Sequence, residues 1–351
     1  MKSDDRPRQD KTLMTPEQSD HFPYGKLLKT VSRTFYLSLK LLPRPVRHPI
    51  SLGYLIARAT DTIADSIKTD ACEQKRLLEQ CSEAITSGKV GDLQIAISDE
   101  IIASVAHPGE RELLSRIDEI LRSLNSSKRS QKDLLKSVLH KIIEGQTLDV
   151  ARFQDPHTLC ALRNEQELEH YIYCVAGSVG EFWTRICELE LGKECFRGEM
   201  LDLLDAGRSF GKGLQLVNIL RDLPADWSRG RCYLPEEDLL REGACLKSTS
   251  FVSPGFLKVC HRWEERCEAY LDEGLRYVVQ ISSRRLRLAS ALPLFLAIRT
   301  LRLIQQMGAK ERWKGVKINR SEVGAIITQA SLASMSAGKL EAYYSELGRN
   351  A

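Results

Sequence analysis

Two stretches of the sequence place acidic side chains at helical spacing. In the first, Asp61 and Asp65 are four residues apart, about one helical turn, so their carboxylates share a face. Tyr54 and Arg58 extend that stripe toward the N-terminus in steps of four and three residues. Stacked carboxylates repel each other, so a helix that carries them needs a compensating positive charge.

The second stretch repeats this spacing. Its stripe consists of Gly211, Gln215, Asn218 and Asp222, in steps of four, three and four residues. Asp226 follows Asp222 after four more residues, but Pro224 lies between them, and proline ends or kinks a helix. We therefore expect a helix over about 199–223, with Asp226 at or just past its bend.

Paired aspartates are well suited to bind a hard divalent cation. Mg2+, with Mn2+ as an alternative, prefers oxygen ligands and is usually held by one or two carboxylates together with substrate phosphates. An isolated acidic pair is more often a solvated surface feature. Here Leu52 to Ile67 contains only Arg58, Asp61 and Asp65 as charged residues. Because buried charges are costly unless they are paired or bind metal, we interpret the two stripes as halves of a metal and diphosphate site.

The residues that follow the second stripe are basic. Arg229, Gly230 and Arg231 precede Tyr233 and Pro235, a pattern that predicts a loop. Two arginines around a glycine could clamp a phosphate in bidentate fashion, whereas the alternative is a solvated turn. We favour the phosphate interpretation because acidic residues lie beside this loop in the sequence.

Helical periodicity continues through the rest of the chain and predicts an all-α fold. The expected helices span about 24–40, 48–66, 165–191, 199–223, 254–280, 284–307 and 320–346, with polar helical sequence over about 70–150. No run of alternating residues indicates strands. We expect a single helical bundle around a central apolar cavity, with the acidic stripes facing each other at its mouth. Gly177 and Gly180, inside an expected helix, predict close approach of a neighbouring helix or of a substrate chain.

The composition excludes several classes of protein. The net charge is only +4, so nothing indicates a nucleic-acid partner. The ten cysteines lack Cys-x-x-Cys spacing and predict reduced thiols in a cytoplasmic protein. The apolar run Leu286–Ile298 is shorter than the ~20 residues of a membrane span, so we expect no transmembrane segment. Residues 1–22 are polar and predict a flexible tail, followed by one all-α domain over 23–348.

Four motifs, in their order along the chain, resemble the squalene and phytoene synthase family over about residues 25–320. They are Ser32-Arg33-Thr34-Phe35, Tyr54-x-x-x-Arg58-x-x-Asp61-Thr-Ile-Ala-Asp65, Tyr171-x-x-x-Val-Ala-Gly177-x-x-Gly180, and Gln215-x-x-Asn218-Ile-Leu-Arg221-Asp222-x-x-x-Asp226 with the loop Arg229-Gly-Arg231-x-Tyr233-Leu-Pro235. The resemblance implies the isoprenoid-synthase helical fold. It also implies that two prenyl diphosphates are joined head to head through a cyclopropylcarbinyl diphosphate.

The resemblance further implies roles for individual residues. The implied metal ligands are Asp61, Asp65, Asn218, Asp222 and Asp226. The implied contacts to substrate diphosphate are Arg33, Arg58, Gln215, Arg221, Arg231 and Tyr233. Tyr171 would move a proton or steer the cation in the first half-reaction, and Tyr54 would line the pocket near it.

Within the family, Ser32-Arg-Thr-Phe35, the Arg58-Ala-x-Asp61-Thr pattern and the Val316-Lys317-Ile318 loop resemble squalene synthases. The loop Arg229-Gly-Arg231-x-Tyr233-Leu-Pro235 is closer to bacterial and phytoene-type members, so we expect a bacterial-type squalene synthase. Such enzymes convert two molecules of farnesyl diphosphate into presqualene diphosphate and then, with NADPH, into squalene. The implied NADPH contacts are Arg33, Arg58, Arg221, Lys317 and Asn319. Asn319 stands where squalene synthases have an arginine, and Ala64 and Ser66 stand where they have further acids.

Two alternatives of different kinds stay open. A phytoene or dehydrosqualene synthase would share the condensation but need no reductant, so the effect of NADPH on the product distinguishes it. A non-catalytic helical scaffold is the second alternative, and the intact aspartate pairs and Tyr171 argue against it. Because the product would be apolar, we also expect peripheral contact with a membrane surface.

Overall fold

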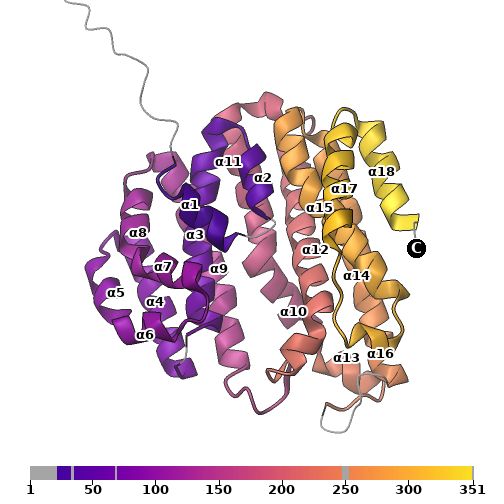
Figure 1. Cartoon of the computed structure of the whole chain (residues 1–351), viewed down its shortest axis with the longest axis horizontal. Coiled ribbons are helices and arrows are strands. Elements are labelled where there is room, and N and C mark those ends of the chain that lie inside the picture. Colours follow the sequence, from indigo (N-terminus) through magenta and orange to yellow (C-terminus); the bar gives the residue numbers. More distant parts are fainter. Residues whose placement is uncertain (1–21, 33–34, 68, 247–252, 350–351) are drawn as a thin grey trace, which may run out of the picture.

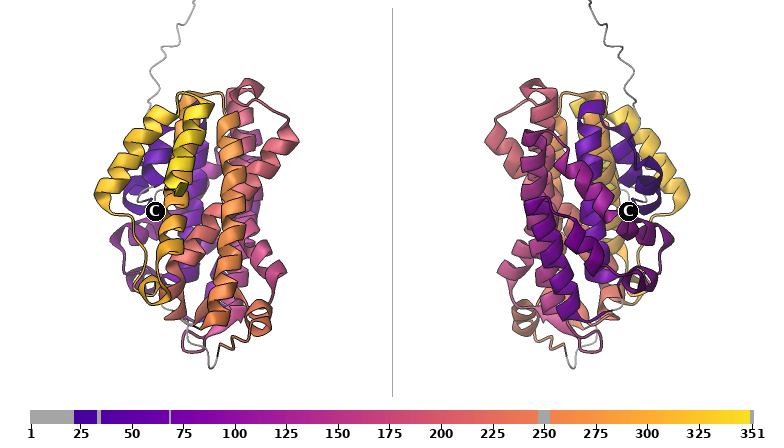
Figure 2. Two further views of the ribbon diagram at one scale, coloured as in Figure 1. Left: turned by 90° about the vertical axis from the view of Figure 1, so that its right-hand side faces the viewer. Right: turned by 90° about the vertical axis from the view of Figure 1, so that its left-hand side faces the viewer.

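The longest of the described helices, α12 (Met200–Trp227), runs through the middle of a helical bundle (Figure 1). The computed structural model describes residues 22–349 apart from 33–34, 68 and 247–252. Helices α11, α14 and α15 pack against α12, and the N-terminal helices form the opposite side of the bundle (Figure 2). The predicted all-α fold is confirmed, while the expected tail lies almost wholly outside the described residues.

The elements follow the predicted order with several changes in their limits. The N-terminal part contains α1 (Gly25–Val31), α2 (Phe35–Leu41), α3 (Arg44–Asp65), α4 (Ala71–Ser87), α5 (Gly91–Ala96), α6 (Asp99–Ser104), α7 (Pro108–Ser115), α8 (Ile117–Asn125) and α9 (Arg129–Arg152). Next come β1 (Cys160–Leu162), α10 (Glu165–Ile172), a π-helix (Tyr173–Gly177), α11 (Ser178–Leu191) and a 3-10 turn (Lys193–Cys195). After α12 come β2 (Arg231–Pro235), α13 (Glu236–Arg241), α14 (Pro254–Gln280), α15 (Arg284–Gln306), α16 (Ala309–Arg312), α17 (Arg320–Ala333) and α18 (Ala337–Arg349).

Helix α12 does not end at Pro224, as the sequence suggested, but continues to Trp227. Proline removes one backbone donor, and tertiary packing compensates for that loss here. The Trp227 ring makes edge contacts with Phe256 and Trp313, with ring centroids 5.5 and 5.7 Å apart. Asp226 is therefore helical, one turn after Asp222.

Helices α11 and α12 approach each other through glycines. A Cβ atom at Gly180 would overlap the carbonyl oxygen of Gly207, and one at Gly211 would overlap that of Ala176. Close approach of a neighbouring helix thus accounts for Gly180. Gly177 also borders this contact, because a Cβ there would lie 3.3 Å from the Arg208 carbonyl oxygen.

Three other sequence expectations were wrong in detail. The expected helix over 24–40 is split into α1 and α2, and the Ser32 hydroxyl donates to the carbonyl oxygen of Leu28 at the end of α1. The expected helix over 320–346 is split into α17 and α18. The loop predicted after α12 contains β2, which pairs in parallel with β1 and aligns Arg231 with Cys160.

Helix α15 forms part of the core. With 23 residues, it is the one described helix that is long and apolar enough to cross a membrane by length and composition. However, 61% of its apolar window is buried inside the bundle, where it contacts α12, α14 and α17. Phe295 is completely buried, as a core helix requires.

Candidate functional site

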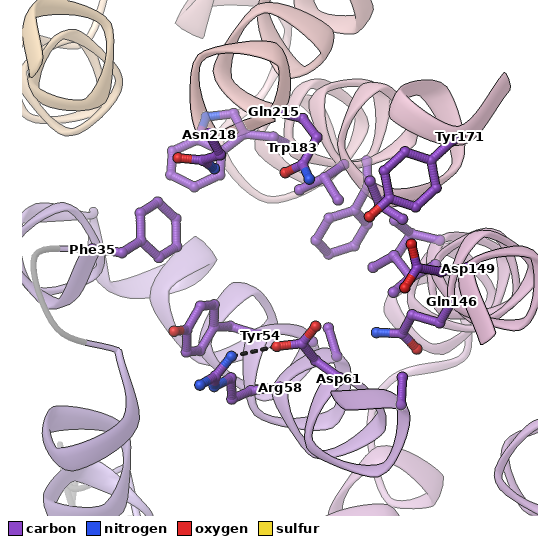
Figure 3. Close-up of a pocket in the computed structure, with 18 of the residues that line it drawn as sticks. Phe35, Tyr54, Arg58, Asp61, Gln146, Asp149, Tyr171, Trp183, Gln215 and Asn218 are labelled. Carbon is purple, nitrogen blue, oxygen red and sulfur yellow. Dashed lines mark hydrogen bonds and ion pairs between the residues drawn. The ribbon is translucent and has the colours of Figure 1, made fainter. Parts of the chain in front are cut away.

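A cavity of about 420 Å3 lies between α3, α9, α11 and α12 (Figure 3). Its apolar lining includes Ile50, Val138, Ile142, Val175, Val179 and Phe182. Aromatic rings of Phe35, Tyr54 and Trp183 form one wall, with centroids of neighbouring rings 5.4 and 6.5 Å apart. The apolar side chains offer no hydrogen-bond partner to water, and the aromatic rings offer π-faces to a positive charge.

The first acidic stripe faces this cavity, as predicted. Tyr54, Arg58 and Asp61 line it (Figure 3). Asp65 also contributes to the lining. Burial, followed by repulsion from Asp65, raises the pKa of Asp61, although its side chain is 38% exposed toward the cavity. Arg58 offsets part of that penalty by pairing with Asp61, and it also pairs with Glu110 of α7 at 2.5 Å.

Two residues of the second stripe supply the opposite wall, whereas Asp222 and Asp226 do not line this cavity. Gln215 and Asn218 line the cavity across from Asp61 (Figure 3). Asp222 and Asp226 continue the same helix by one and two turns. Burial and repulsion from Asp222 raise the pKa of Asp226 to about 6, and Asp65 adds to that repulsion. The carboxylates of the two stripes thus interact electrostatically, although they are far apart in the sequence.

Strand β2 brings Arg231 and Tyr233 to the acidic side of the cavity. The Arg231 Nη1 atom lies 2.7 Å from Asp65 and 3.1 Å from Asp149 of α9. The Tyr233 hydroxyl donates to the other oxygen of Asp149 at 2.7 Å. Gly230 just before the strand has a φ of 75°, a left-handed conformation that favours glycine.

Tyr171 lies beside this group at the end of α10. Its ring stacks on Tyr233 with centroids 5.1 Å apart, and its side chain lines the cavity. Burial, then the nearby Asp149 carboxylate, raise the pKa of Tyr171 well above its ordinary value. The phenol therefore stays protonated and can donate a hydrogen bond.

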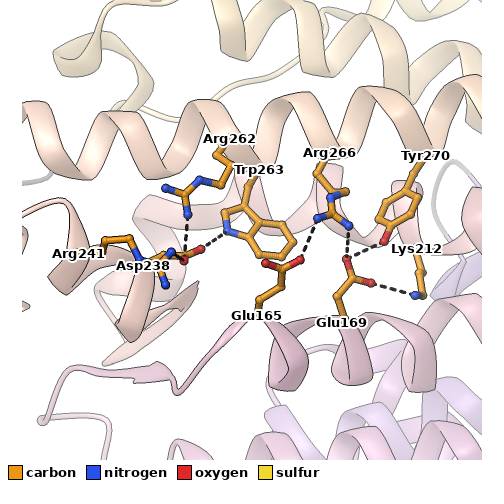
Figure 4. Close-up of polar contacts among 9 residues, drawn as sticks. All are labelled: Glu165, Glu169, Lys212, Asp238, Arg241, Arg262, Trp263, Arg266 and Tyr270. Carbon is orange, nitrogen blue, oxygen red and sulfur yellow. Dashed lines mark hydrogen bonds and ion pairs between the residues drawn. The ribbon is translucent and has the colours of Figure 1, made fainter.

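A polar network on the outer side of α10 fixes the helix that carries Tyr171 (Figure 4). Glu169, two residues earlier, accepts hydrogen bonds from Tyr270 at 2.6 Å and from Lys212 at 2.9 Å. Glu165, one helical turn before Glu169, pairs with Arg266 at 2.8 Å. These charge-assisted contacts tie α10 to α12 and α14.

Three polar residues of the site were not predicted from the sequence. Asp149 and Gln146 of α9 line the cavity, and Glu110 is the buried partner of Arg58. Asp149 is only 5% exposed, and burial raises its pKa to about 7 although Arg231 counteracts the shift. Asp149 could have been noticed in the sequence because it is a charged residue between the apolar residues Leu148 and Val150. A charge within an apolar helical run was also part of the argument for Asp61.

Two further cavities adjoin the first. One of about 190 Å3 shares Phe35, Trp183 and Asn218 with it and extends along Gly207 and Ser290. The other, of about 320 Å3, lies between α2, α12, α15 and α17. Its lining includes Arg221, whose guanidinium pairs with the adjacent Asp222 at 2.5 Å.

The remaining predicted residues lie elsewhere. Arg33 is outside the described residues. Lys317 is exposed in the segment before α17, and the Asn319 side chain caps that helix by accepting the backbone N–H of Glu322 at 2.8 Å. Neither residue lines the main cavity.

Comparison with known proteins identifies the family. The squalene/phytoene synthase family profile matches residues 28–322. The chain belongs to this family. Its enzymes are of the prenyltransferase type and act on prenyl diphosphates.

Individual relatives include both activities of the family. The chain is 26% identical over 307 residues to a squalene synthase of Gibberella zeae, a match that covers 84% of this chain and 60% of that protein. It is 29% identical over 217 residues to a bifunctional lycopene cyclase/phytoene synthase of Blakeslea trispora, covering 62% of this chain and 33% of that protein. The chain thus spans between a third and two thirds of the length of these curated relatives.

Solved structures share the fold. A TcSQS complex superposes with a TM-score of 0.72 at 19% identity, covering 93% of this chain and 96% of that chain. A dehydrosqualene synthase in complex with a ligand gives a TM-score of 0.58 at 20% identity, covering 88% of this chain and 94% of that one. At these identities the similarity shows the fold alone.

Proposed function

We propose that the protein is a squalene synthase that joins two molecules of farnesyl diphosphate to presqualene diphosphate and reduces it to squalene with NADPH. The observation that carries this proposal is an apolar cavity with Asp61 and Asp65 on one wall and the Asn218 helix on the other. The apolar side chains of the cavity would contact the prenyl tail of the substrate, and its polar side chains would lie near the diphosphate.

The residues around the mouth fit bound Mg2+. Asp61, Asp149 and Asp226 all have a pKa raised first by burial, and neighbouring carboxylates add to each shift. A hard cation would relieve that penalty, with Asp61, Asp65, Asp222 and Asp226 as carboxylate ligands and Asn218 as an amide ligand. When bound, the metal would neutralise the diphosphate and make it a better leaving group.

The chain's own residues would orient the leaving group. Arg231, already between Asp65 and Asp149, is placed to pair with diphosphate oxygens, and Arg58 lines the cavity two turns before Asp65 on α3. Tyr171, held protonated, would donate a hydrogen bond to the departing diphosphate. Tyr233 and Asp149 would hold Arg231 and the Tyr171 ring in place.

The apolar and aromatic walls would protect the allylic cation. Phe182, Val175 and Ile142 exclude water that would quench it, and the Tyr54 and Trp183 rings present π-faces without a nucleophile. The adjoining cavity along Gly207 offers space for a second isoprenoid chain. This division of space supports a reaction between two apolar substrates.

The reductive step rests on the resemblance to squalene synthases, and Lys317 and Arg221 are the residues we assign to it. A phytoene or dehydrosqualene synthase is the competing assignment, supported by the phytoene synthase relatives. Two incubations of purified protein with farnesyl diphosphate and Mg2+, one with NADPH and one without, distinguish the two assignments. Squalene formed only with NADPH supports our proposal, whereas dehydrosqualene in both incubations contradicts it.

A matched variant tests the metal site in the same assay. Asp61→Asn should reduce turnover about 100-fold while the helical circular dichroism stays unchanged. Asp205→Asn, which alters an exposed aspartate on α12, is the control and should keep wild-type activity. Wild-type turnover by Asp61→Asn would refute the metal assignment.

A further inference from the structure

A cluster of three metal-ligating side chains lies outside the cavity, where α9 meets α10. Glu144 comes from α9, His170 from α10 and Cys174 from the π-helix that follows. The His170 Nε2 atom is 3.1 Å from Glu144 Oε1 and 3.6 Å from Cys174 Sγ. One ligand atom from each residue lies within 4.8 Å of the others, and no other such group of three occurs among the described residues.

We propose that Glu144, His170 and Cys174 bind a thiophilic divalent cation of the Zn2+ class. Zinc bonds of about 2.0–2.3 Å in a tetrahedral site place neighbouring ligand atoms about 3.3–3.8 Å apart. The distances from His170 Nε2 are close to that range before any adjustment to an ion. Three protein ligands leave the fourth position to water.

The local sequence produces this convergence. His170 and Cys174 are four residues apart, so they share a helical face. Gly145, next to Glu144, lets the π-helix approach α9, because a Cβ there would lie 2.9 Å from the Cβ of Cys174. Lys141 pairs with Glu144 Oε2 at 2.8 Å, which leaves Oε1 directed at His170.

Cys174 is the buried member of this cluster. It is completely buried, whereas Glu144 and His170 are exposed. Because the thiolate is the form that binds metal, a cation bound here must displace the thiol proton. A cation would enter between the exposed Glu144 and His170 side chains and bind the sulfur, displacing the thiol proton to solvent.

The bound cation would fasten two walls of the main cavity from outside. Three residues of the cavity lining are close in sequence to the proposed ligands. Gln146 lies two residues after Glu144, Tyr171 directly follows His170, and Val175 directly follows Cys174. The proposed site is therefore a clamp that holds α9 against the segment carrying Tyr171. It uses none of the residues proposed for Mg2+ or diphosphate.

Cobalt is the probe for this site because its thiolate complexes absorb in the near ultraviolet. We expect the reduced full-length protein to bind one equivalent of Co2+ with a thiolate charge-transfer band, and Zn2+ to abolish the band by displacement. Cys174→Ser should lose the band, and His170→Gln should bind at least ~10-fold more weakly. Cys245→Ser, which removes an exposed thiol elsewhere, should match the wild type.

Zn2+ should also raise the melting temperature of the wild type and of Cys245→Ser more than that of His170→Gln. His170 is an exposed residue, so its variant remains informative if Cys174→Ser fails to fold. The proposal would be overturned by any one of three results. These are an undiminished cobalt band in Cys174→Ser, no cobalt band in the folded wild type, and wild-type cobalt affinity in His170→Gln. Asp61→Asn should keep the band, so loss of catalysis and loss of this site are distinguishable.

Discussion

Replacement of Asp149 by asparagine should stabilise the metal-free protein, and more so at higher pH. The Asp149 carboxyl is 5% exposed, and burial raises its pKa from the ordinary 3.8 to about 7. The folded protein therefore holds this proton more tightly than the unfolded chain. Folding stability contributed by Asp149 is highest below pH ~4 and falls as the pH rises toward 7.

The structure sets the size of this effect. A pKa difference of about 3 units corresponds to about 4 kcal/mol at most, since each unit represents 1.36 kcal/mol. Asparagine keeps an acceptor for the Tyr233 hydroxyl and is neutral at every pH, and Arg231 retains Asp65 as a partner. The advantage of Asp149→Asn should therefore grow by about 2–3 kcal/mol between pH 5 and pH 8.

Urea unfolding followed by circular dichroism, in EDTA at both pH values, measures that change. The difference between variant and wild type isolates Asp149 from the other carboxylates of the site. Asp155→Asn is a matched control: hydrogen bonds from Thr158 and the backbone of His157 lower the pKa of exposed Asp155, so this variant should not gain stability with rising pH. If wild type and Asp149→Asn lose stability in parallel, the buried carboxyl is not the source and the reasoning fails.

Four further predictions concern catalysis and packing. Asp222→Asn should lower Mg2+-dependent turnover about 100-fold without changing the helical circular dichroism, and normal turnover would remove it from the metal site. Tyr171→Phe should lose most of the first condensation in a presqualene diphosphate assay, and an unchanged rate would refute its hydrogen-bonding role. Lys317→Ala should spare presqualene diphosphate but reduce squalene formation; loss of both products would contradict a role in reduction. Gly180→Ala should destabilise the fold by at least ~2 kcal/mol because its Cβ meets backbone of α12, whereas Gly324→Ala, in open space, should be neutral or stabilising in thermal unfolding.

The acidic stripes were predictable from the sequence because each lies on one helix. Tyr54, Arg58, Asp61 and Asp65 face the cavity as their spacing required. Strand β2 was not predictable in this way, because its partner β1 lies about 70 residues earlier in the sequence. The position of Arg231 depends on the pairing of these two strands. Local spacing determines which side chains share a face, whereas pairing between distant segments depends on the whole fold.

Asp149 shows a different limit. Its helix gave no second acid at helical spacing, so the argument from paired carboxylates did not apply. Only the structure shows that Tyr233 and Arg231 converge on it from β2. The predicted end of α12 was wrong for a similar reason. Contacts of Trp227 with Phe256 and Trp313 outweighed the local effect of Pro224.

The glycines of α12 connect the packing of the bundle with the shape of its cavity. Gly207 brings α12 close to α11, Gly211 brings it close to the π-helix, and both glycines also line the adjoining cavity of about 190 Å3. A larger side chain at either position would push the helices apart and fill space proposed for an isoprenoid chain. In that same wall the Ser290 hydroxyl is buried without a hydrogen-bond partner among the described residues. A buried polar group without a partner is costly in a core, so its position in the wall fits a space that is filled when substrate or water is bound.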